Sequence, residues 1–515
     1  MDLTKFKRIS INLYFLFLLI LGLSASLQAA TLVVNTTSDV ESASDGKCSL
    51  REAVASANDG TATDTSCGTV SASDNVIQLE SATYCLVSEL FIRNSVTLAG
   101  VSGGATTLDG GNGSSTSCTT ASQSRIVSVI TDGITVNLND LILQGGINTT
   151  GGGGIYLEGL STLHLSQSQI LSNQAINTNT LGANGGGIYA HNCESLTLTN
   201  THVDSNLASA TGDRAFGGGV SAVLCHSITV ENSTFDQNQS TTAVTDKGAY
   251  GGGFFASGND MVTITSSTFS NNEAIHTGTA TSTSSDAYGG GVYIYGKLAN
   301  ILNTTISGNK SQAKDDAYGG GFFTKLDSTI NISHSTLADN QATGSNAYGG
   351  GISHFPADST GTISGTINII NTLLVDNTVS GTTTSKGLNC YQTIYTWGTN
   401  LFSDTSGCTL DDTKAATTVT DSTSSNAELS SLADNGGAVK TQAISSSSSA
   451  KDMGTCLDVL GNSITTDARG VTRDAACDIG SYEYVSSSAT SSTGDTGTSV
   501  ASQSGGCSLM REQSP

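Results

Sequence analysis

Proline, tryptophan and positive charge are scarce in this sequence. Its 515 residues include two prolines, one tryptophan, and 20 Lys and Arg against 43 Asp and Glu, which gives a formal net charge of -23. So acidic a chain repels phosphate groups, which argues against nucleic acid and anionic lipid as partners. The 60 glycines could indicate low complexity, but 37% of the residues are hydrophobic, enough for a long, thin core.

Long apolar runs are also missing, apart from one near the start. Lys5, Lys7 and Arg8 precede an apolar run over residues 11–23, the pattern of a secretory signal peptide. We therefore predict an exported protein whose mature chain begins near Thr31 and carries a formal charge of about -25 after loss of three positive charges and Asp2. No later run could span a bilayer as a helix, so any attachment to a membrane needs other means.

Triple glycines recur through the middle of the chain. Each triplet is followed by an apolar residue, and the spacing of 30 to 38 residues is typical of repeat architectures. The last glycines of the triplets are Gly154, Gly187, Gly219, Gly253, Gly291, Gly321 and Gly351.

An asparagine follows each triplet, in most repeats eighteen or nineteen residues later. An apolar residue stands three positions before it, a Ser or Thr five before it, and apolar residues eight and ten before it. The asparagines are Asn173, Asn206, Asn238, Asn272, Asn309, Asn340 and Asn377.

Apolar residues spaced by two are typical of β-strands, and no repeat contains a helical period. We predict an all-β solenoid in which three short strands form one rung and successive rungs pair in parallel. Equivalent side chains then lie in columns along the stack. The Asn and Ser/Thr columns are interpreted as hydrogen-bonded ladders at the turns.

Two features mark one edge of the predicted solenoid. The segment between the asparagine and the next triplet varies in length, which predicts loops that could contact a partner. Five consecutive triplets are also preceded by an aromatic residue, which could stack on sugar rings or on its own neighbours. These candidate ligand-binding residues are Phe216, Tyr250, Tyr288, Tyr318 and Tyr348.

The two ends of the chain differ from the repeats. The segment CSLREAVASAN (48–58) contains Ser49 and Glu52 as a capping box before a short amphipathic helix, which we expect to cover the open end of the solenoid. Toward the C-terminus, three blocks replace the repeats: LADNGGAVKTQAI (432–444), DARGVTR (467–473) and CDIGSYEY (477–484). Residues 485–506 are rich in Ser, Thr and Gly, which is typical of a flexible stalk.

Disulfides are the expected state of cysteines in an exported protein. Cys193 and Cys225 each lie six residues after a triplet, so they should occupy equivalent points on adjacent rungs, within the reach of a disulfide. Strand alternation turns His226 away from Cys225, so we favour a disulfide over a zinc site here. By proximity in sequence we also predict the pairs Cys48–Cys67, Cys85–Cys118, Cys390–Cys408 and Cys456–Cys477, with Cys507 left over.

Catalytic motifs are not evident. No HExxH motif, phosphate loop or Ser-His-Asp order is present, so no catalytic residue, metal ligand or cofactor is predicted. Acidic residues of the repeats are mostly scattered. Four precede the turn asparagines, namely Asp204, Asp236, Asp339 and Asp376, and we interpret them as solvated turn residues.

Three segments resemble known families. The GGG triplets with Phe235-x-x-Asn238 and Phe269-x-x-Asn272 resemble the repeats of polymorphic outer-membrane proteins, which are β-helix surface proteins and adhesins. CSLREA (48–53) is similar to the N-terminal domain named for these residues, and residues 432–484 resemble the choice-of-anchor domain, with Ala438 and Gln442 in place of its usual proline and histidine. The resemblance implies a single-stranded right-handed parallel β-helix, similar to pectin lyase.

The predicted organisation has six parts. They are a signal peptide (1–30), an N-terminal cap (31–75), irregular first rungs (76–150), the repeat solenoid (151–410), a choice-of-anchor-like region (411–484) and a flexible tail (485–515). The end SGGCSLMREQSP resembles the start of a glycine-cysteine sorting signal, so Cys507 is a candidate processing or lipid-attachment site of a truncated tail. The chain has no C-terminal strands typical of an autotransporter barrel.

We expect a secreted or outer-membrane-associated bacterial protein that binds glycans or host-cell molecules, as an adhesin does. A polysaccharide lyase or glycoside hydrolase is the alternative, because the same fold carries many such enzymes. A structural role in the envelope or matrix is a third interpretation.

Overall fold

The computed structural model describes residues 29–42, 45–111, 118, 123–178, 180, 182–278, 285–325, 327–355, 365–415 and 420–486. The chain divides into one compact unit over residues 1–484 and a separate C-terminal unit over residues 485–515. The sorting-signal residues, including Cys507, lie outside the described residues. The helices and strands of the described chain all belong to the first unit.

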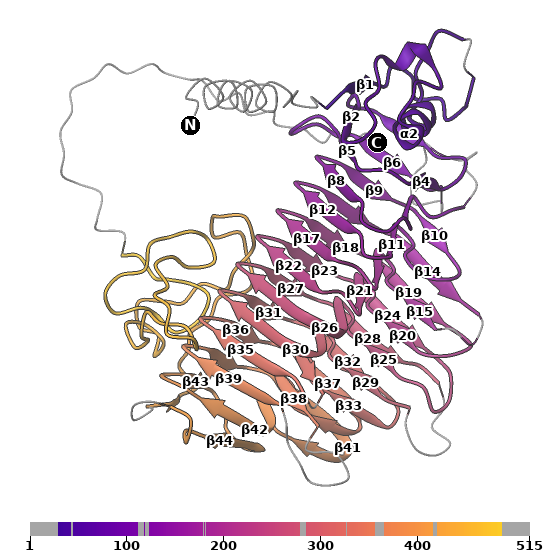
Figure 1. The fold of residues 1–515 in the computed structure, drawn as a ribbon. Helices are drawn as coiled ribbons and strands as arrows, with labels where there is room; N and C mark the ends of the chain where they lie inside the picture. The colour runs from indigo at the N-terminus through magenta and orange to yellow at the C-terminus, as the bar shows by residue number, and fades with distance from the viewer. Residues whose placement is uncertain are drawn as a thin grey trace, which may run out of the picture. The chain divides into compact units, whose positions relative to one another are not determined.

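The described chain is an all-β solenoid in which three sheets of parallel strands run along a stack of rungs (Figure 1). Sheet A contains 20 strands. They are β1 (Thr31–Val33), β2 (Asn75–Gln78), β4 (Leu90–Ile92), β5 (Val96–Ala99), β7 (Val127–Val129), β8 (Thr135–Asn139), β11 (Ile155–Glu158), β12 (Thr162–Ser166), β16 (Ile188–His191), β17 (Ser195–Thr199), β21 (Val220–Val223), β22 (Ser227–Glu231), β26 (Phe254–Thr265), β30 (Val292–Leu302), β34 (Phe322–Thr324), β35 (Thr329–Ser333), β38 (Ile352–His354), β39 (Thr366–Ile370), β42 (Cys390–Thr396) and β44 (Cys408–Asp411).

Sheets B and C form the other two sides of the described stack, with 12 and 13 strands. Sheet B consists of β3 (Thr83–Cys85), β6 (Thr107–Asp109), β9 (Ile142–Gln144), β13 (Gln169–Leu171), β18 (His202–Asp204), β23 (Thr234–Asp236), β27 (Thr268–Ser270), β31 (Thr305–Ser307), β36 (Thr336–Ala338), β40 (Leu373–Val375), β43 (Leu401–Phe402) and β45 (Ser422–Thr423). Sheet C consists of β10 (Ile147–Asn148), β14 (Gln174–Asn177), β15 (Ala183–Asn184), β19 (Leu207–Ala210), β20 (Ala215–Phe216), β24 (Gln239–Thr242), β25 (Ala249–Tyr250), β28 (Glu273–His276), β29 (Ala287–Tyr288), β32 (Lys310–Gln312), β33 (Asp316–Tyr318), β37 (Gln341–Tyr348) and β41 (Thr378–Lys386).

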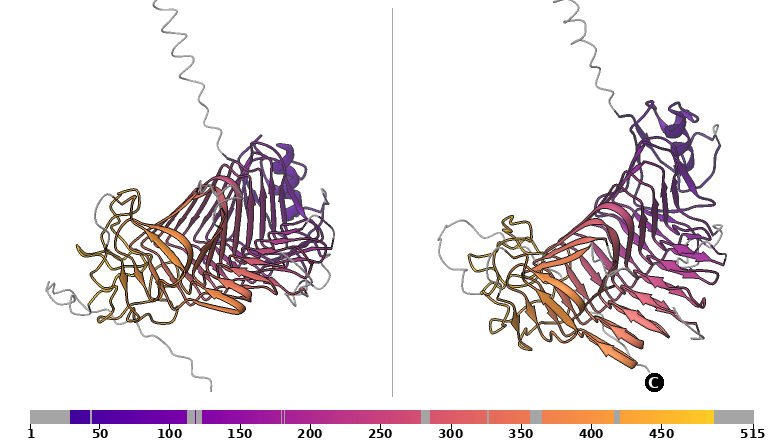
Figure 2. Two further views of the ribbon diagram at one scale, coloured as in Figure 1. Left: turned by 90° about the horizontal axis from the view of Figure 1, so that it is seen from below. Right: turned by 60° about the horizontal axis from the view of Figure 1, so that its bottom comes forward.

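A complete rung has more strands than the three that the repeat predicts. The rung over residues 188–216 visits sheet A twice (β16, β17), sheet B once (β18) and sheet C twice (β19, β20). The prediction of three strands per rung was therefore too low, because a bend divides the strand on two of the three sides. In β26 and β30 the two segments of sheet A merge into one long strand. Figure 2 shows the stacked rungs from two further sides.

The core lies inside the stack, because alternate side chains of each strand point inward. In β17, for example, Leu196 and Leu198 are buried, and in β18 Val203 is buried. The same alternation on every rung places apolar residues in continuous columns, and the largest buried side chains include Phe235, Phe254 and Phe269. Stacking is necessary, since one rung exposes its apolar side chains both above and below.

The triple glycines and the asparagines belong to one structural feature. Gly251 has a φ of +57°, the left-handed conformation that favours glycine. A Cβ atom on Gly252 would lie 2.3 Å from the carbonyl oxygen of Gly290, and one on Gly253 would lie 2.8 Å from Cγ of Asn272. The third glycine is therefore required because the asparagine side chain packs against it.

The seven asparagines form a buried ladder of hydrogen bonds along the stack. Oδ1 of Asn272 accepts bonds from the backbone N–H of Asn238 (3.0 Å) and from its Nδ2 (2.9 Å). Nδ2 of Asn272 in turn donates to the backbone oxygen of Phe235 (2.9 Å) and to Oδ1 of Asn309 (2.9 Å). Asn389 adds a further step beyond Asn377. Each side chain thus joins its own turn to the rungs on both sides.

The variable segments are more ordered than the predicted loops. After each asparagine the chain runs outward along one wall of sheet C and returns along the other, as in β24 and β25 (Figure 1). Small side chains fill the space between the two walls, among them Ala249, Ala274, Ala287 and Ala317. These segments therefore form a narrow paired projection, with small side chains filling most of the space between its walls.

The first end of the stack is covered by helix α2 (Leu50–Asp59), as the sequence predicts. Ser49 and Glu52 form the expected capping box, and Leu50, Ala53 and Val54 are buried. A short 3₁₀ helix, η1 (Thr65–Cys67), follows. Among the described residues five disulfides are present, and they join the pairs that the sequence suggested: Cys48–Cys67, Cys85–Cys118, Cys193–Cys225, Cys390–Cys408 and Cys456–Cys477.

We predict that Asn272→Ala weakens the middle of the stack. The substitution removes four hydrogen bonds and leaves the backbone N–H and one side-chain N–H of Asn238 buried without an acceptor, at a cost of about 3 kcal/mol. Hydrogen exchange should show lost protection in β24 and β28. Gln312→Ala, on the outer face of sheet C, serves as the control, and equal exchange in both variants would contradict a stabilising role for the ladder.

Candidate binding groove

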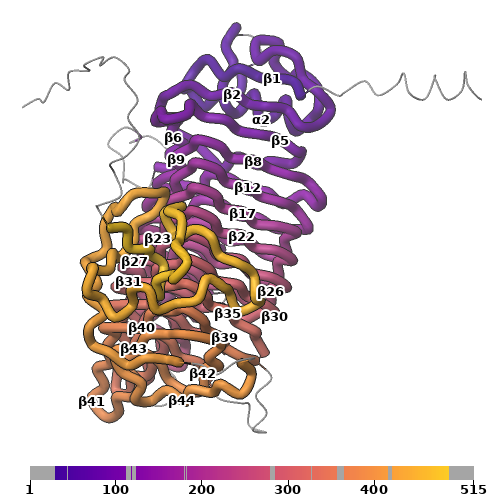
Figure 3. The backbone as a smooth tube through the Cα atoms, turned by 90° about the vertical axis from the view of Figure 1, so that its left-hand side faces the viewer, coloured from indigo at the N-terminus to yellow at the C-terminus, as the bar shows by residue number. Residues whose placement is uncertain are grey.

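The C-terminal region (427–484) folds back onto sheet B of the later rungs. Thr268 Oγ1 donates to the backbone oxygen of Lys440 (2.6 Å), and Thr305 Oγ1 lies 2.8 Å from Ser481 Oγ. Figure 3 shows this region, in yellow, lying over β27 and β31. It packs on the outer face of sheet B from β27 onward, and its loop 434–440 faces β13, β18 and β23 across a hollow.

A buried ionic network holds this region together. Arg473 pairs with Glu483 at 3.0 Å, and neither side chain is more than 2% exposed. Arg469 pairs with Asp467 at 2.7 Å and lies over the ring of Tyr482. Arg473 also donates to Asn303 Oδ1 of the solenoid (3.0 Å). The charged residues of the DARGVTR and CDIGSYEY blocks are therefore structural, and they attach the region to the stack.

A groove follows the border between this region and the open part of the solenoid. It consists of three hollows with volumes of about 460, 520 and 550 Å³, each within the range of small-molecule sites. All three are lined by Ala438, at the tip of the projecting loop 434–440. Ala438 is one of the two positions that depart from the choice-of-anchor pattern, and the other, Gln442, donates to Asp339 Oδ2 (2.8 Å).

The first hollow contains two carboxylates on adjacent rungs. β18 and β23 are in register, so Asp204 lies opposite Asp236 on the outer face of sheet B. His202 and Thr234 form the neighbouring column, and Asp434 and Lys440 face them from the loop. The interpretation of Asp204 and Asp236 as solvated turn residues was therefore incomplete. Strand register on sheet B pairs them, and the distant loop encloses them.

The two carboxylates have different surroundings. Oδ1 of Asp236 accepts hydrogen bonds from Ser270 Oγ (2.7 Å) and Asn271 Nδ2 (2.8 Å), which fix its position. Asp204 is half-buried and has one side-chain donor, Ser205. Desolvation, with a further contribution from the charge of Asp236, raises the pKa of Asp204 above its ordinary value. The hollow therefore contains two different carboxylates. Asp236 is held in place by hydrogen bonds, and Asp204 has a raised pKa.

The aromatic residues before the triplets stack on one another. The ring centroids of Phe216, Tyr250, Tyr288, Tyr318 and Tyr348 are 4.9 to 5.3 Å apart, with interplanar angles of 4° to 18°. A second column of Phe255, Tyr293 and Phe323 packs beside them, outside the solenoid core. The faces of the inner rings are occupied by neighbouring rings, so only their edges could contact a sugar.

A second hydrogen-bonded column lies on the outer face of sheet A, and our sequence reasoning missed it. Asn368 Nδ2 donates to Asn331 Oδ1, and Asn331 Nδ2 donates to Asn300 Oδ1, both at 2.9 Å. Trp397, the one tryptophan, donates to Asn368 Oδ1. The signal was present in the repeat, since each asparagine stands between the two apolar residues of its strand.

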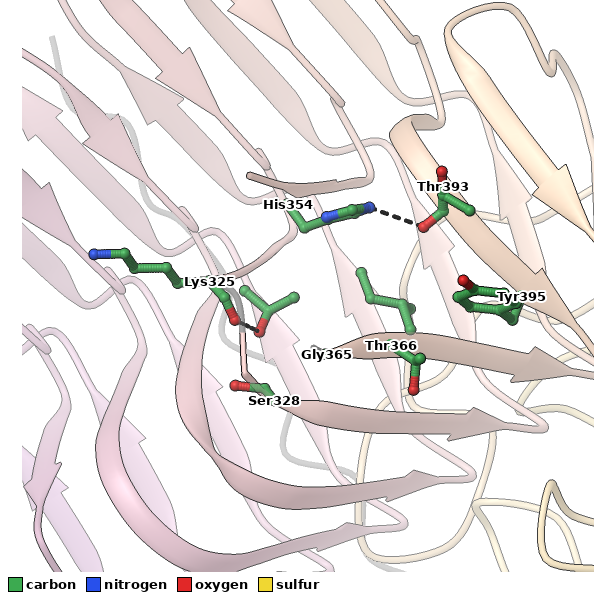
Figure 4. A pocket seen from close by; sticks show the side chains of 9 residues that line it. Lys325, Ser328, His354, Gly365, Thr366, Thr393 and Tyr395 are labelled. Carbon is green, nitrogen blue, oxygen red and sulfur yellow. Dashed lines mark hydrogen bonds between the residues drawn. The ribbon is translucent and has the colours of Figure 1, made fainter. Parts of the chain in front are cut away.

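A smaller cavity at the bend of sheet A is too small to serve as a ligand site. Lys325, His354 and Tyr395 are among its lining residues (Figure 4), and its volume is about 10 Å³, room for one water molecule. His354 is held by backbone oxygens, since Nε2 lies 2.8 Å from that of Thr393 and Nδ1 lies 2.9 Å from that of Phe355.

Comparisons with known proteins add nothing to these observations. No protein-family model matches the chain, and no curated protein matches it. Among the described residues, no group of three or more His, Cys, Asp or Glu side chains could hold a metal ion. The described helices include none that is long and apolar enough to cross a membrane.

We predict that acid weakens the attachment of the C-terminal region through His334. Burial, with a contribution from the Arg473 charge, lowers the pKa of this histidine to about 3. A histidine with a depressed pKa contributes stability above its ordinary pKa, and that stability is lost as the pH falls toward 3. Between pH 7 and pH 4 the loss should reach about 3 kcal/mol.

The matched variant is His334→Asn, because asparagine occupies the equivalent left-handed corner positions at Asn303 and Asn371. Thermal unfolding from pH 7 to pH 4 should show the wild type losing stability relative to this variant. Parallel pH profiles would show that His334 is not the source of acid sensitivity.

Proposed function

We propose that this chain is an exported right-handed parallel β-helix protein of the bacterial surface. The support is the stack of three parallel sheets, the signal-like N-terminus, and five disulfides of a kind common outside the cytoplasm. The handedness rests on the resemblance to polymorphic outer-membrane proteins. Retention at the outer membrane through processing or lipid attachment of the tail at Cys507 is part of the same proposal.

We further propose that the protein binds a glycan in the groove under loop 434–440, as an adhesin does. The observation that carries this proposal is the groove itself, because residues of the solenoid and of the C-terminal region line its three hollows together. Its lining is rich in hydrogen-bonding groups, including Gln169, His202, Thr234 and Asn232. Such a surface suits a ligand with many hydroxyl groups.

The charge of the groove narrows the choice of glycan. Asp204, Asp236 and Asp434 line the first hollow, and Lys440 is its one Lys or Arg. An acidic glycan would be repelled by this excess of carboxylates and by the net charge of the chain. An uncharged or amino-bearing glycan is therefore the favoured ligand.

Binding should depend on His202 and Asp236. We predict that His202→Ala and Asp236→Asn each weaken retention of an uncharged or amino-bearing glycan by about tenfold, equivalent to about 1.4 kcal/mol. The measurement is affinity for a panel of immobilised neutral, amino and acidic polysaccharides. Gln312→Ala is the control, and a panel in which nothing binds would favour a structural envelope or matrix role.

A glycoside hydrolase is the second candidate, favoured by the pair Asp204 and Asp236. Strands on adjacent rungs are about 4.8 Å apart, close to the separation of about 5 Å between the carboxyl groups of retaining glycosidases. The raised pKa of Asp204 fits an acid, and Asp236 would be the nucleophile. Polymer shortening that Asp236→Asn abolishes would establish the enzyme, whereas unchanged polymer length supports binding alone.

A further inference from the structure

The outer face of sheet A carries regular columns of uncharged polar side chains beside the groove. In its second segment, β12, β17, β22 and the end of β26 pair in register over five residues each. The central column of this face contains His164, Thr197, Thr229 and Thr263, all half-buried. Ser195 and Ser227 occupy one flanking column. We call this surface the threonine face.

The hydroxyl groups of the threonine face are free to bind. Those of Thr197, Thr229 and Thr263 have no hydrogen-bond partner in the described part of the chain. Farther along the same column, Asn300, Asn331 and Asn368 bond to one another instead. The unpaired hydroxyl groups are therefore confined to the earlier rungs.

Charge sets the threonine face apart from the chain as a whole. Glu231 is the one acidic side chain among the outward residues of β12, β17, β22 and residues 261–265, although the chain carries a net charge of -23. Burial lowers the pKa of His164, so this side chain is neutral at neutral pH. Such a face is complementary to an uncharged ligand that offers hydroxyl groups.

The threonine face is continuous with the proposed groove. Glu231, Thr265 and Leu302, from the outer column of sheet A, line the hollow of about 520 Å³. Ser333, farther along that column, instead accepts a bond from the backbone N–H of Val459. In Figure 3, β12, β17 and β22 lie beside the C-terminal region without being crossed by it. A ligand too long for the groove can therefore extend directly onto this open surface.

We propose that the threonine face extends the binding groove and that the ligand is a strand of an uncharged polysaccharide, several sugar units long. The inference rests on the proposed glycan-binding function and specifies its ligand. Four rungs at about 4.8 Å spacing provide roughly 15 Å of additional contact. One end of the polysaccharide binds in the groove. The next sugar units along the polymer bond to the threonine hydroxyl groups.

The test compares short and long probes. Disaccharides and octasaccharides of neutral β-glucan, mannan and dextran are titrated against the full chain and against a triple variant, Thr197→Val, Thr229→Val and Thr263→Val. Valine keeps the branched shape that favours strands and removes only the hydroxyl group. Thr241→Val, an outward-facing residue of sheet C, is the matched control.

We expect at least one octasaccharide to bind about tenfold more tightly than its disaccharide, equivalent to about 1.4 kcal/mol. The triple variant should lose most of that advantage while its affinity for the disaccharide stays unchanged, and the control should behave as the wild type. Equal affinity for both lengths, or an unaffected triple variant, overturns this inference but leaves the groove proposal intact. Failure of every probe overturns this inference, and failure of the neutral and amino polysaccharides of the groove test as well overturns both.

Discussion

The buried asparagine ladder is the interaction on which the stack depends. Each amide satisfies polar groups of two neighbouring rungs at a point where the chain turns and cannot pair its own backbone. The third glycine of each triplet packs against that amide, as Gly253 does against Asn272. Because the two features touch, they stay side by side from rung to rung even where the chain between them is longer, and the sheets between them stay in register.

A regular stack would present the same surface along its whole length. The C-terminal region makes the rungs differ, because it covers some of them and not others. It covers the later rungs through polar contacts such as those of Thr268, Thr305 and Asn303. Its buried Arg473–Glu483 pair lies at the point of attachment, where Arg473 also bonds to Asn303. The earlier rungs remain open, so the groove and the threonine face lie where the covering ends. The site exists because two parts of one chain meet there.

Asp204 and Asp236 are the residues that decide between the two proposed functions, glycan binding and glycoside hydrolysis. A pair of carboxylates in different surroundings is what glycoside hydrolysis needs. Yet the groove is open on one side, and loop 434–440 offers Lys440 as its one positive side chain there. The threonine face beside it, with Glu231 as its one acidic side chain, offers polar groups spread along the axis, which favours retention of a polymer. We therefore place binding first and treat cleavage as the alternative to be tested.

Local and periodic features were determined by the sequence itself. The period of two, the repeated triplets and the Ser49–Glu52 capping box predict parallel strands, stacked rungs and a covering helix, because they depend on neighbouring residues or on equivalent positions one rung apart. The same reasoning placed Cys193 beside Cys225. The repeat predicted too few strands per rung, because a bend within a sheet has no clear signal in the sequence.

Tertiary structure alone decided where the candidate site lies. Asp204 and Asp434 are far apart in the sequence, and no period connects the C-terminal region with the rungs that it covers. Its docking depends on the fit of particular side chains, such as Arg473 against Asn303, and such contacts have no regular spacing. The sequence therefore predicted the scaffold, whereas the groove required the folded chain.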